Sequence, residues 1–274
     1  SPYSKTSWFR NECIVRWARY ISDGKTFYGI YEDEQINEVR GSPFEGYSLS
    51  AIKHKISDVK LLAPVIPPTF YAAGINYERH IREAAEIFGR DPILPEKADI
   101  GYRAANAIIA HDEPVLIPKD ATEKIQYEAE LVVVIGKEVK NVSRENSLEC
   151  ILGYTIGNDV SERTWQAQDR TMWRAKNTDT FKPMGPWIET NVDLDQMETS
   201  VALNNKELLK FKTNSMIFGV EEYIHQITKY LTLHPGDVIW MGTDGASPNM
   251  SHGDICEITI TGIGTLRNSI IKLS

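Results

Sequence analysis

The segment QYEAELVVVIG, residues 126–136, places two acidic residues directly before the most apolar run of the chain. That run, from 132 to 135, holds three valines and an isoleucine and is typical of a buried strand. Side chains two positions apart in a strand share a face, so Glu128 and Glu130 point the same way. Burying two such carboxylates without a positive partner is very costly. Either this end of the strand faces water, or positive charge lies between the two acids.

A third acid follows a second apolar segment. ILGYTIGN, residues 151–158, has the pattern of a strand and leads into Asp159. Two strands that deliver carboxylates to one end build the oxygen-rich site that Mg²⁺ and Mn²⁺ prefer. Three carboxylates leave about three of six octahedral positions for water or a chelating substrate. Acids are also common at solvated strand ends, so the spacing alone leaves that alternative open.

A helix with a histidine and a glutamate is predicted upstream. The segment NYERHIREAAE, residues 76–86, predicts a helix that starts near Asn76 and stops at Gly89. His80 and Glu83 are then neighbours on one face of the helix. A histidine that a glutamate orients can act as a general base, because its pKa lies near the operating pH. An isolated His-x-x-Glu is more often an exposed pair with no catalytic role, and this reading also stays open.

The first part of the chain predicts a small antiparallel module. Short apolar bursts alternate from 13 to 40, and SDGK at 22–25 stands where a hairpin turn belongs. A short helix is expected at SLSAIKHKI, residues 48–56. The prolines of the next segment exclude a helix and indicate a boundary near residue 65. We therefore expect a module of residues 1–65 and a main domain of residues 66–274.

The main domain predicts many strands and few helices. Helices are expected at SRENSLECILGY, residues 143–154, with Ser143 as its cap, and at GVEEYIHQITKYLTL, residues 219–233. The last third is rich in strand patterns, and LNNKEL at 203–208 indicates a hairpin, since asparagine adopts positive φ readily. The regular strand–helix alternation of a doubly wound sheet or a (β/α)₈ barrel is missing. The sequence therefore predicts a strand-rich α+β fold.

Composition argues against two classes of function. The 274 residues carry a net charge of −8 and no lysine-rich or arginine-rich run, so nucleic-acid binding is not expected. No apolar stretch approaches the roughly 20 residues of a membrane-spanning helix. The first 13 residues contain no apolar signal core. Cys13, Cys150 and Cys256 are odd in number and far apart, so we expect reduced thiols in a cytoplasmic protein.

Six segments together resemble the fumarylacetoacetate hydrolase family. They are GINYERHIREAAE, YEAELVVVIGK, GYTIGNDVSERTWQ, WRAKNTDTFKPMGPW, HPGDVIWMGT and GIGTLRN. Their order and spacing fit from about residue 70 to the C-terminal end, and the joint match is very specific. The resemblance implies a mixed β-roll with flanking helices behind a variable N-terminal module, and a homodimer. Within the family the chain resembles the acylpyruvases and the 2-hydroxyhepta-2,4-diene-1,7-dioate isomerases.

The resemblance also implies roles for individual residues. Glu128, Glu130 and Asp159 stand where the family binds Mg²⁺ or Mn²⁺. His80 and Glu83 stand where it keeps an acid–base dyad, on a segment that orders over bound substrate. Lys176 matches a lysine near the metal-bound acid, and Arg163 and Gln166 match positions that bind the substrate. Gly242 and Thr243 match a carboxylate-binding turn. Tyr77 and Asn76 match the entry to the lid.

Two positions depart from the family pattern. Many members carry a lysine before the strand that contains AIIA, whereas GYRAANAII places Arg103 there. Arginine grips a carboxylate through two bonds but does not release a proton, so the role predicted for Arg103 is electrostatic binding of the substrate. Many members also read Gly-Thr-Pro-x-Gly, whereas this chain reads GTDGAS with Asp244. The extra acid indicates a changed substrate end.

The resemblance implies a hydrolase that cleaves a C–C bond in a 2,4-dioxo acid of the acylpyruvate or fumarylpyruvate type, through an enolate that the metal stabilises. The presence of the His–Glu pair favours hydrolysis. Decarboxylation of oxaloacetate and keto–enol isomerisation of a 2-hydroxydienedioate use the same enolate chemistry and remain alternatives. A non-catalytic module that binds a dicarboxylate is a further alternative. The expected partner in each case is a small 2-oxo or dicarboxylic acid, within a pathway such as aromatic catabolism.

Overall fold

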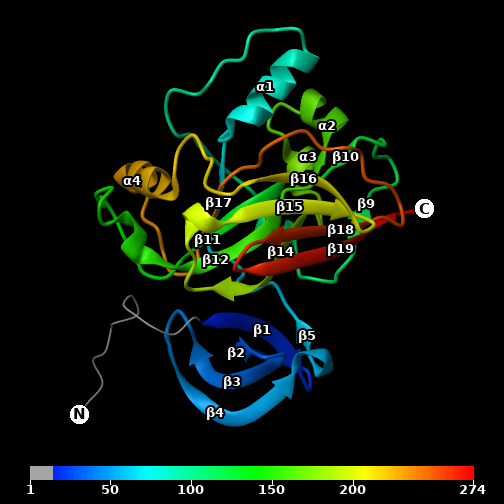
Figure 1. Cartoon of the computed structure of the whole chain (residues 1–274). Coiled ribbons are helices and arrows are strands. Elements are labelled where there is room, and N and C mark those ends of the chain that lie inside the picture. Colours follow the sequence, from blue (N-terminus) through cyan, green and yellow to red (C-terminus); the bar gives the residue numbers. More distant parts are fainter. Residues whose placement is uncertain (1–14) are drawn as a thin grey trace.

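The computed structural model describes residues 15–274, so the prediction for Cys13 falls outside the described residues. A small module at one end of the molecule packs beneath a larger body of sheets, and helix α1 stands at the opposite end (Figure 1). Strands dominate and do not alternate regularly with helices. This architecture confirms the strand-rich α+β class that the sequence predicts.

The N-terminal module is an antiparallel meander. Its strands are β1 (Arg16–Ser22), β2 (Lys25–Glu32), β3 (Gln35–Ser42), β4 (Gly46–Lys55) and β5 (Lys60–Leu61), with a 3₁₀ turn η1 (Ile56–Asp58) between the last two. The predicted turn at SDGK is confirmed, because Asp23 and Gly24 both take positive φ between β1 and β2. The helix predicted at 48–56 is wrong, since this segment is strand β4. Its backbone groups pair along β3, and this pairing overrides a weak local preference.

One long sheet runs from the module into the main domain. Strand β1 joins β14 through two residue pairs, Arg16 with Glu189 and Trp17 with Ile188. The order is then β14, β12, β11, β17, β6 and β7, with the short strand β8 beside β14. Their bounds are β14 Lys182–Glu189, β12 Ile151–Asn158, β11 Ala129–Ile135, β17 Val238–Trp240, β6 Phe70–Ala73, β7 Ile100–Tyr102 and β8 Ile108–Ile109.

A second, five-stranded sheet completes the main domain. Its order is β16 (Lys206–Lys212), β15 (Glu198–Leu203), β18 (Ile255–Ile260), β19 (Gly264–Lys272) and β9 (Val115–Ile117), and β10 (Ile125–Gln126) pairs separately with β13 (Ser161–Glu162). The hairpin predicted at 203–208 is confirmed between β15 and β16. Asn204 and Asn205 form its turn with φ of 51° and 67°.

The apolar run that opened the sequence lies at the centre of the fold. Every residue of β11 is buried. Leu131, Val133 and Ile135 join the core between the two sheets, whereas Val132 and Val134 join the core on the other face of the long sheet. Because both faces of β11 are covered, residues 131–135 are continuously apolar instead of alternating.

Helices are few and short. They are α1 (Glu78–Ile87), α2 (Arg163–Gln168), α3 (Trp173–Asn177) and α4 (Val220–Tyr230), with 3₁₀ turns η2 (Ala105–Ala107), η3 (Ser147–Cys150) and η4 (Leu194–Gln196). The predictions for α1 and α4 are confirmed to within a few residues at each end. Among residues 15–274, no helix combines the length and apolar character needed to cross a membrane.

The helix predicted from Ser143 is wrong. Only Ser147–Cys150 form a 3₁₀ turn, and strand β12 begins at once with Ile151. Strands β11 and β14 flank β12 and pair with its backbone. Gly153 allows the close approach, since a Cβ there would lie 2.5 Å from the carbonyl oxygen of Glu189.

Candidate active site

Three carboxylates converge at one end of the β11–β12 pair. Glu128 and Glu130 stand at the start of β11, and Asp159 directly follows β12. The antiparallel register places Ala129 opposite Asn158, so the three acids meet. One oxygen of each lies within 4.8 Å of the others, and their exposed fractions are 7%, 3% and 2%. The solvated strand end is therefore the wrong alternative.

Backbone bonds hold the loop of Asp159 against β11. The Asp159 amide donates to the Glu128 carbonyl at 2.9 Å. In return, the Glu128 amide donates to the side-chain oxygen of Asn158 at 3.1 Å. These reciprocal bonds fix the separation of the two acids before any ligand arrives.

Two cations flank Glu128. The Lys176 ammonium of α3 lies 2.5 Å from its Oε1, and the Arg163 guanidinium at the start of α2 lies 3.2 Å from its Oε2. Lys176 also donates to the Ser161 hydroxyl at 2.6 Å. Burial alone would raise the pKa of Glu128, but Lys176 and Arg163 lower it to about 2.

Asp159 has two further cationic partners. Arg103 approaches in a bidentate manner, with Nη2 3.0 Å from Oδ2 and Nε 3.3 Å from Oδ1. Lys182, whose side chain is fully buried, lies 2.8 Å from Oδ1. Burial opposes ionisation, yet Arg103, Lys176 and Lys182 hold the pKa of Asp159 well below its usual range. The contact with Arg103 differs from the substrate contact that the sequence predicts for it.

Glu130 sits in a different electrostatic environment. Burial and then the negative charges of Asp159 and Glu128 raise its pKa well above the ordinary value. Its Oε2 accepts a hydrogen bond from the Gly242 amide at 2.9 Å. The amide of Gly242, predicted to bind a substrate carboxylate, is thus occupied by Glu130 in this structure.

The acids open into a cavity of about 330 Å³. Eleven of the residues that the sequence predicts for the site line this cavity: Asn76, His80, Arg103, Glu128, Glu130, Asp159, Arg163, Gln166, Lys176, Gly242 and Thr243. They come from α1 and the segment before it, the residue after β7, the start of β11, the turn after β12, helices α2 and α3, and the loop after β17. The volume is that of an ordinary small-molecule site.

His80 lies on α1 at the edge of this cavity. Its Nδ1 lies 2.6 Å from the carbonyl oxygen of Gly245, and its backbone amide donates to Asp244 Oδ1 at 2.9 Å. Asp244 accepts a second bond from the Gly245 amide at 2.9 Å. The carboxylate therefore satisfies a free amide in the first turn of α1. Asp244 is not among the cavity-lining residues, so it anchors the helix, which differs from the substrate end that the sequence predicts.

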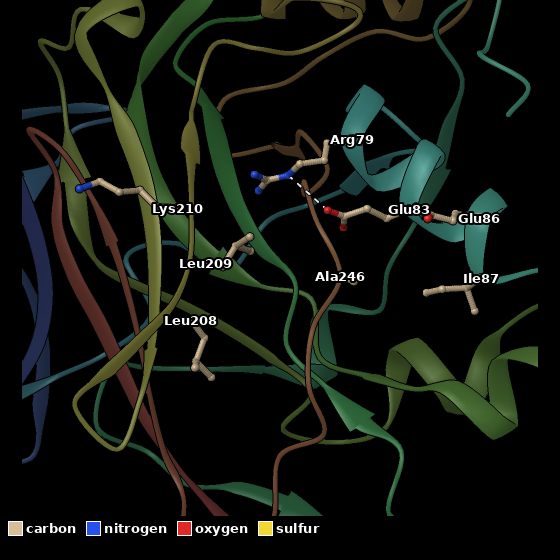
Figure 2. Close-up of a pocket in the computed structure, with 8 residues that line it drawn as sticks. All are labelled: Arg79, Glu83, Glu86, Ile87, Leu208, Leu209, Lys210 and Ala246. Atoms are coloured by element: carbon tan, nitrogen blue, oxygen red, sulfur yellow. Dashed lines mark ion pairs between the residues drawn. The ribbon is translucent and has the colours of Figure 1, made fainter.

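Glu83 does not join the acid cluster. Its carboxylate lies 3.8 Å from the Arg79 guanidinium. Both residues line a separate hollow of about 600 Å³ between α1 and β16. Figure 2 shows their side chains pointing toward each other there. No hydrogen bond links Glu83 to His80 within residues 15–274, so the predicted dyad is not assembled in this arrangement.

Tyr77 also faces away from the cavity. Its hydroxyl donates to the carbonyl oxygen of Thr213 at 2.6 Å, and its ring packs edge-on against Phe211. Only 1% of the residue is exposed. The side chain, which the sequence predicts to bind the substrate, packs against the second sheet and does not line the cavity in this structure. Asn76, its neighbour, bonds to the backbone of Phe218 and Met241.

Arg163 and Gln166, which the sequence predicts to bind the substrate, differ from Thr243 in their hydrogen bonding. Arg163 donates to Gln166 and to Gln126, each at 2.8 Å, in addition to its contact with Glu128. Thr243 is buried, and within the described part of the chain its hydroxyl has no hydrogen-bond partner. A buried unpaired hydroxyl in a cavity wall is costly unless a ligand satisfies it. Thr243 therefore fits a ligand-binding role.

Sequence reasoning missed Lys182 and the supporting residues Asn158 and Ser161. The signal for Lys182 was present, since FKPMGP places a lysine at the head of an otherwise apolar strand. Its ammonium donates to the carbonyl oxygens of Val160 and Phe181 at 2.9 Å and 2.8 Å. These bonds and Asp159 make a fully buried lysine tolerable.

The donor set fits a hard divalent cation. Three carboxylate oxygens at the observed spacing offer the charge and ligand type that Mg²⁺ and Mn²⁺ select. Two of the acids, Glu128 and Asp159, are held ionised by their cationic neighbours. Burial and the two neighbouring acids raise the pKa of Glu130, and a bound cation would oppose this effect.

Comparison with known proteins settles the family. The family model described as fumarylacetoacetate (FAA) hydrolase C-terminal matches residues 69–271. The chain belongs to the fumarylacetoacetate hydrolase family. A second family model, described as Rv2993c-like N-terminal, matches residues 15–64. The division into residues 1–65 and 66–274 stays a proposal about how the chain folds.

Several members of the fumarylacetoacetate hydrolase family resemble this chain over most of its length. Protein Rv2993c of Mycobacterium tuberculosis is 37% identical across 86% of this chain and 87% of its own. The solved 5-carboxymethyl-2-hydroxymuconate delta-isomerase from Mycobacterium smegmatis has a TM-score of 0.85 at 33% identity, covering 94% of this chain and 100% of that one. The 2-hydroxyhepta-2,4-diene-1,7-dioate isomerase from Mycobacterium marinum has a TM-score of 0.84 at 33% identity, covering 94% and 98%.

Proposed function

We propose that this protein is a metal-dependent hydrolase that cleaves a C–C bond in a 2,4-dioxo acid of the acylpyruvate or fumarylpyruvate type. The observation that carries the proposal is the buried cluster of Glu128, Glu130 and Asp159, with His80 on the same cavity. The cluster supplies a cation site, and the histidine supplies a base beside it.

The three acids would hold Mg²⁺ or Mn²⁺. When bound, the ion would act as a Lewis acid on the oxygens of the 2-oxo acid. Lys176 and Arg103 reach the same acids from either side. Their positive charges favour binding of an anionic substrate and stabilise negative charge that develops on its oxygens.

His80 is placed to move the proton. Because a carbonyl oxygen only accepts, the contact with Gly245 requires that Nδ1 carries the hydrogen, which leaves Nε2 as the basic nitrogen. Nε2 would take a proton from water as the water oxygen bonds to C4 of the substrate. The C3–C4 bond then breaks, its electron pair stays on C3, and the proton that His80 holds is returned to C3. The products are a carboxylic acid and pyruvate.

Enolate chemistry without water attack is the second candidate. One observation favours it: Glu83 pairs with Arg79 and not with His80, so the dyad associated with hydrolysis is not formed. A single histidine suffices to shift a proton in a keto–enol isomerisation or after a decarboxylation. Two solved relatives at 33% identity are called isomerases, which also favours this candidate. A non-catalytic dicarboxylate-binding module is the remaining alternative.

Product identity separates these candidates. The protein is incubated with Mg²⁺ or Mn²⁺ and with acylpyruvates, fumarylpyruvate, oxaloacetate and 2-hydroxydienedioates, and the products are read by NMR. Hydrolysis predicts pyruvate plus a second acid, with one atom of ¹⁸O from labelled water in that acid. Carbon dioxide or an isomer without ¹⁸O would replace the hydrolase proposal by the second candidate. Binding without turnover of any substrate would support the non-catalytic module.

The assembly and location of the protein remain predictions. We expect a homodimer and a cytoplasmic protein that acts on small acids and binds neither nucleic acid nor membrane. Sedimentation equilibrium of the purified chain tests the dimer directly, since a single species at the monomer mass of 31.0 kDa would contradict it.

A further inference from the structure

A second cavity adjoins the acid-lined one. It measures about 680 Å³, roughly twice the 330 Å³ of the inner cavity. The two share His80, Arg163 and Gln166, so they form one continuous cleft with these residues at the junction. A molecule bound to the inner acids through one end has room to extend past His80 into the outer cavity.

Apolar surface makes up the larger part of the wall of the outer cavity, beside a set of polar side chains. Helix α1 contributes Ala84, Ile87 and its following residue Phe88, and α2 and the loop after β17 contribute Ala167 and Ala246. Ile87 and Phe88 are each 72% exposed, which is a large apolar area to leave in water beside an active-site cleft. Burying them against a ligand would stabilise the complex by about 25 cal/mol per Å² of apolar surface covered.

Polar groups of the outer cavity are largely bonded to one another. Gln126 donates to Asn249 at 3.0 Å and accepts from Arg163 at 2.8 Å. Ser247 donates to the carbonyl oxygen of Tyr127 at 2.7 Å. These groups therefore offer little to a second charged end. Among the described residues that line this cavity, Lys124, which is exposed, and Arg163 carry the positive charge.

We propose that the outer cavity is a subsite for an uncharged apolar distal group of the substrate, such as an alkyl chain or a phenyl ring, with Ile87 and Phe88 as the residues that set this preference. The inference rests on the proposed function, because it takes the inner acids as the site of the reacting 2-oxo acid. It adds the chemical class of the distal group of the substrate, which is the end that the acids of the inner cavity do not bind.

Figure 2 shows that Ile87 and Ala246 also border the hollow between α1 and β16. One side of helix α1 thus borders the outer cavity, and the side that faces the second sheet borders the hollow between α1 and β16. The end of α1 has space to settle onto a ligand of variable length without displacing core side chains.

The test is a substrate series with Mg²⁺ present. Acylpyruvates with unbranched alkyl chains from acetyl to octanoyl, a benzoyl member and a carboxylated member are compared by kcat/KM. The wild-type protein should prefer the longer alkyl and benzoyl members over acetyl. Phe88→Ala and Ile87→Ala should each reduce this preference by about tenfold, the range expected for a change of a few carbons in an apolar pocket. Leu49→Ala, an exposed apolar position on β4, is the matched control and should leave the preference intact.

Two results would overturn the subsite. One is turnover of acetylpyruvate with no gain from longer chains. The other is a preference for the carboxylated member that Lys124→Met removes, because a dicarboxylate would then occupy the cavity. If no dioxo acid is turned over, the proposed function fails separately. Calorimetry with metal and 2-oxo acids of increasing alkyl length then still tests the subsite: affinity that is independent of chain length would refute it.

Discussion

The imidazole Nδ1 of His80 lies 2.6 Å from the carbonyl oxygen of Gly245. A backbone carbonyl therefore orients the ring and selects its tautomer. In many acid–base pairs a carboxylate has this role. Glu83, on the same helix, is instead paired with Arg79. The chemistry assigned to this helix thus depends more on the loop after β17 than on the neighbouring glutamate.

His80→Ala is expected to lower kcat by about 10²–10⁴-fold while Mg²⁺ affinity stays near that of the wild type. Glu83→Gln should cost much less, since Gly245 already orients the ring. Steady-state kinetics and calorimetric metal titration of both variants check this. Equal losses of turnover for the two variants would show that the dyad forms during the reaction; a matching loss of metal affinity in His80→Ala would remove its assigned role.

Glu130→Gln is expected to weaken Mg²⁺ or Mn²⁺ binding by more than about tenfold. Glutamine keeps the shape of Glu130 and removes a negative charge that burial, Asp159 and Glu128 disfavour, so the variant should fold normally. Metal titration by calorimetry and circular dichroism measure the two properties. Glu123→Gln, which changes an exposed acid five residues before Glu128, serves as the control. Unchanged affinity in Glu130→Gln would contradict the cation site.

Asn76→Ala is expected to destabilise the fold by about 2–4 kcal/mol. Its side chain donates to Phe218 and Met241 at 3.1 Å and 3.0 Å and accepts from the Phe218 amide at 2.9 Å. Removal leaves these buried backbone groups unpaired. Urea denaturation measures the change, and Asn214→Ala, which loses an exposed contact with Asp195, should differ from the wild type by at most about 0.5 kcal/mol. Equal effects would show that the buried network matters little.

Gly157→Ala is expected to cost about 1–3 kcal/mol through overpacking. An added Cβ would lie 2.5 Å from the ring of Trp240, which is fully buried on the neighbouring core face. Thermal unfolding should show a lower Tm. The control is Gly101→Ala, whose added Cβ would meet nothing closer than 3.9 Å and should change Tm little. A Gly157→Ala protein as stable as the wild type would mean that β12 shifts freely.

The thiols of Cys150 and Cys256 are expected to resist alkylation in the native protein. Burial raises their pKa values to about 11 and about 12 from the ordinary 9.0, so the reactive thiolate is scarcer in the fold at any pH below those values. Raising the pH from about 7 to about 9 should increase labelling of a model thiol but not of these two. Mass spectrometry of the labelled peptides, with urea-unfolded protein as the positive control, decides the outcome. Rapid native labelling of either thiol would contradict its burial.

Much of the fold could be predicted because local signals and tertiary packing agree. The apolar run 132–135 is a central strand, Asn204 and Asn205 make a hairpin turn, and α4 is an amphipathic helix as expected. The failures at 48–56 and 143–154 lie where pairing with a neighbouring strand satisfies the backbone. The pattern within each segment does not show the strand with which that segment pairs.

The sequence by itself determined the acids and their shared face, because the two-residue period of a strand places Glu128 and Glu130 together. The family motifs extended this to Asp159 and to the residues that surround it. Only the tertiary structure decided which charges meet. Lys182 reaches Asp159, Arg103 grips the same acid, and Asp244 holds α1, since these contacts join segments tens of residues apart. Because the acids are buried, these contacts strongly affect the pKa of each acid. The spacing of residues along the chain does not encode that effect.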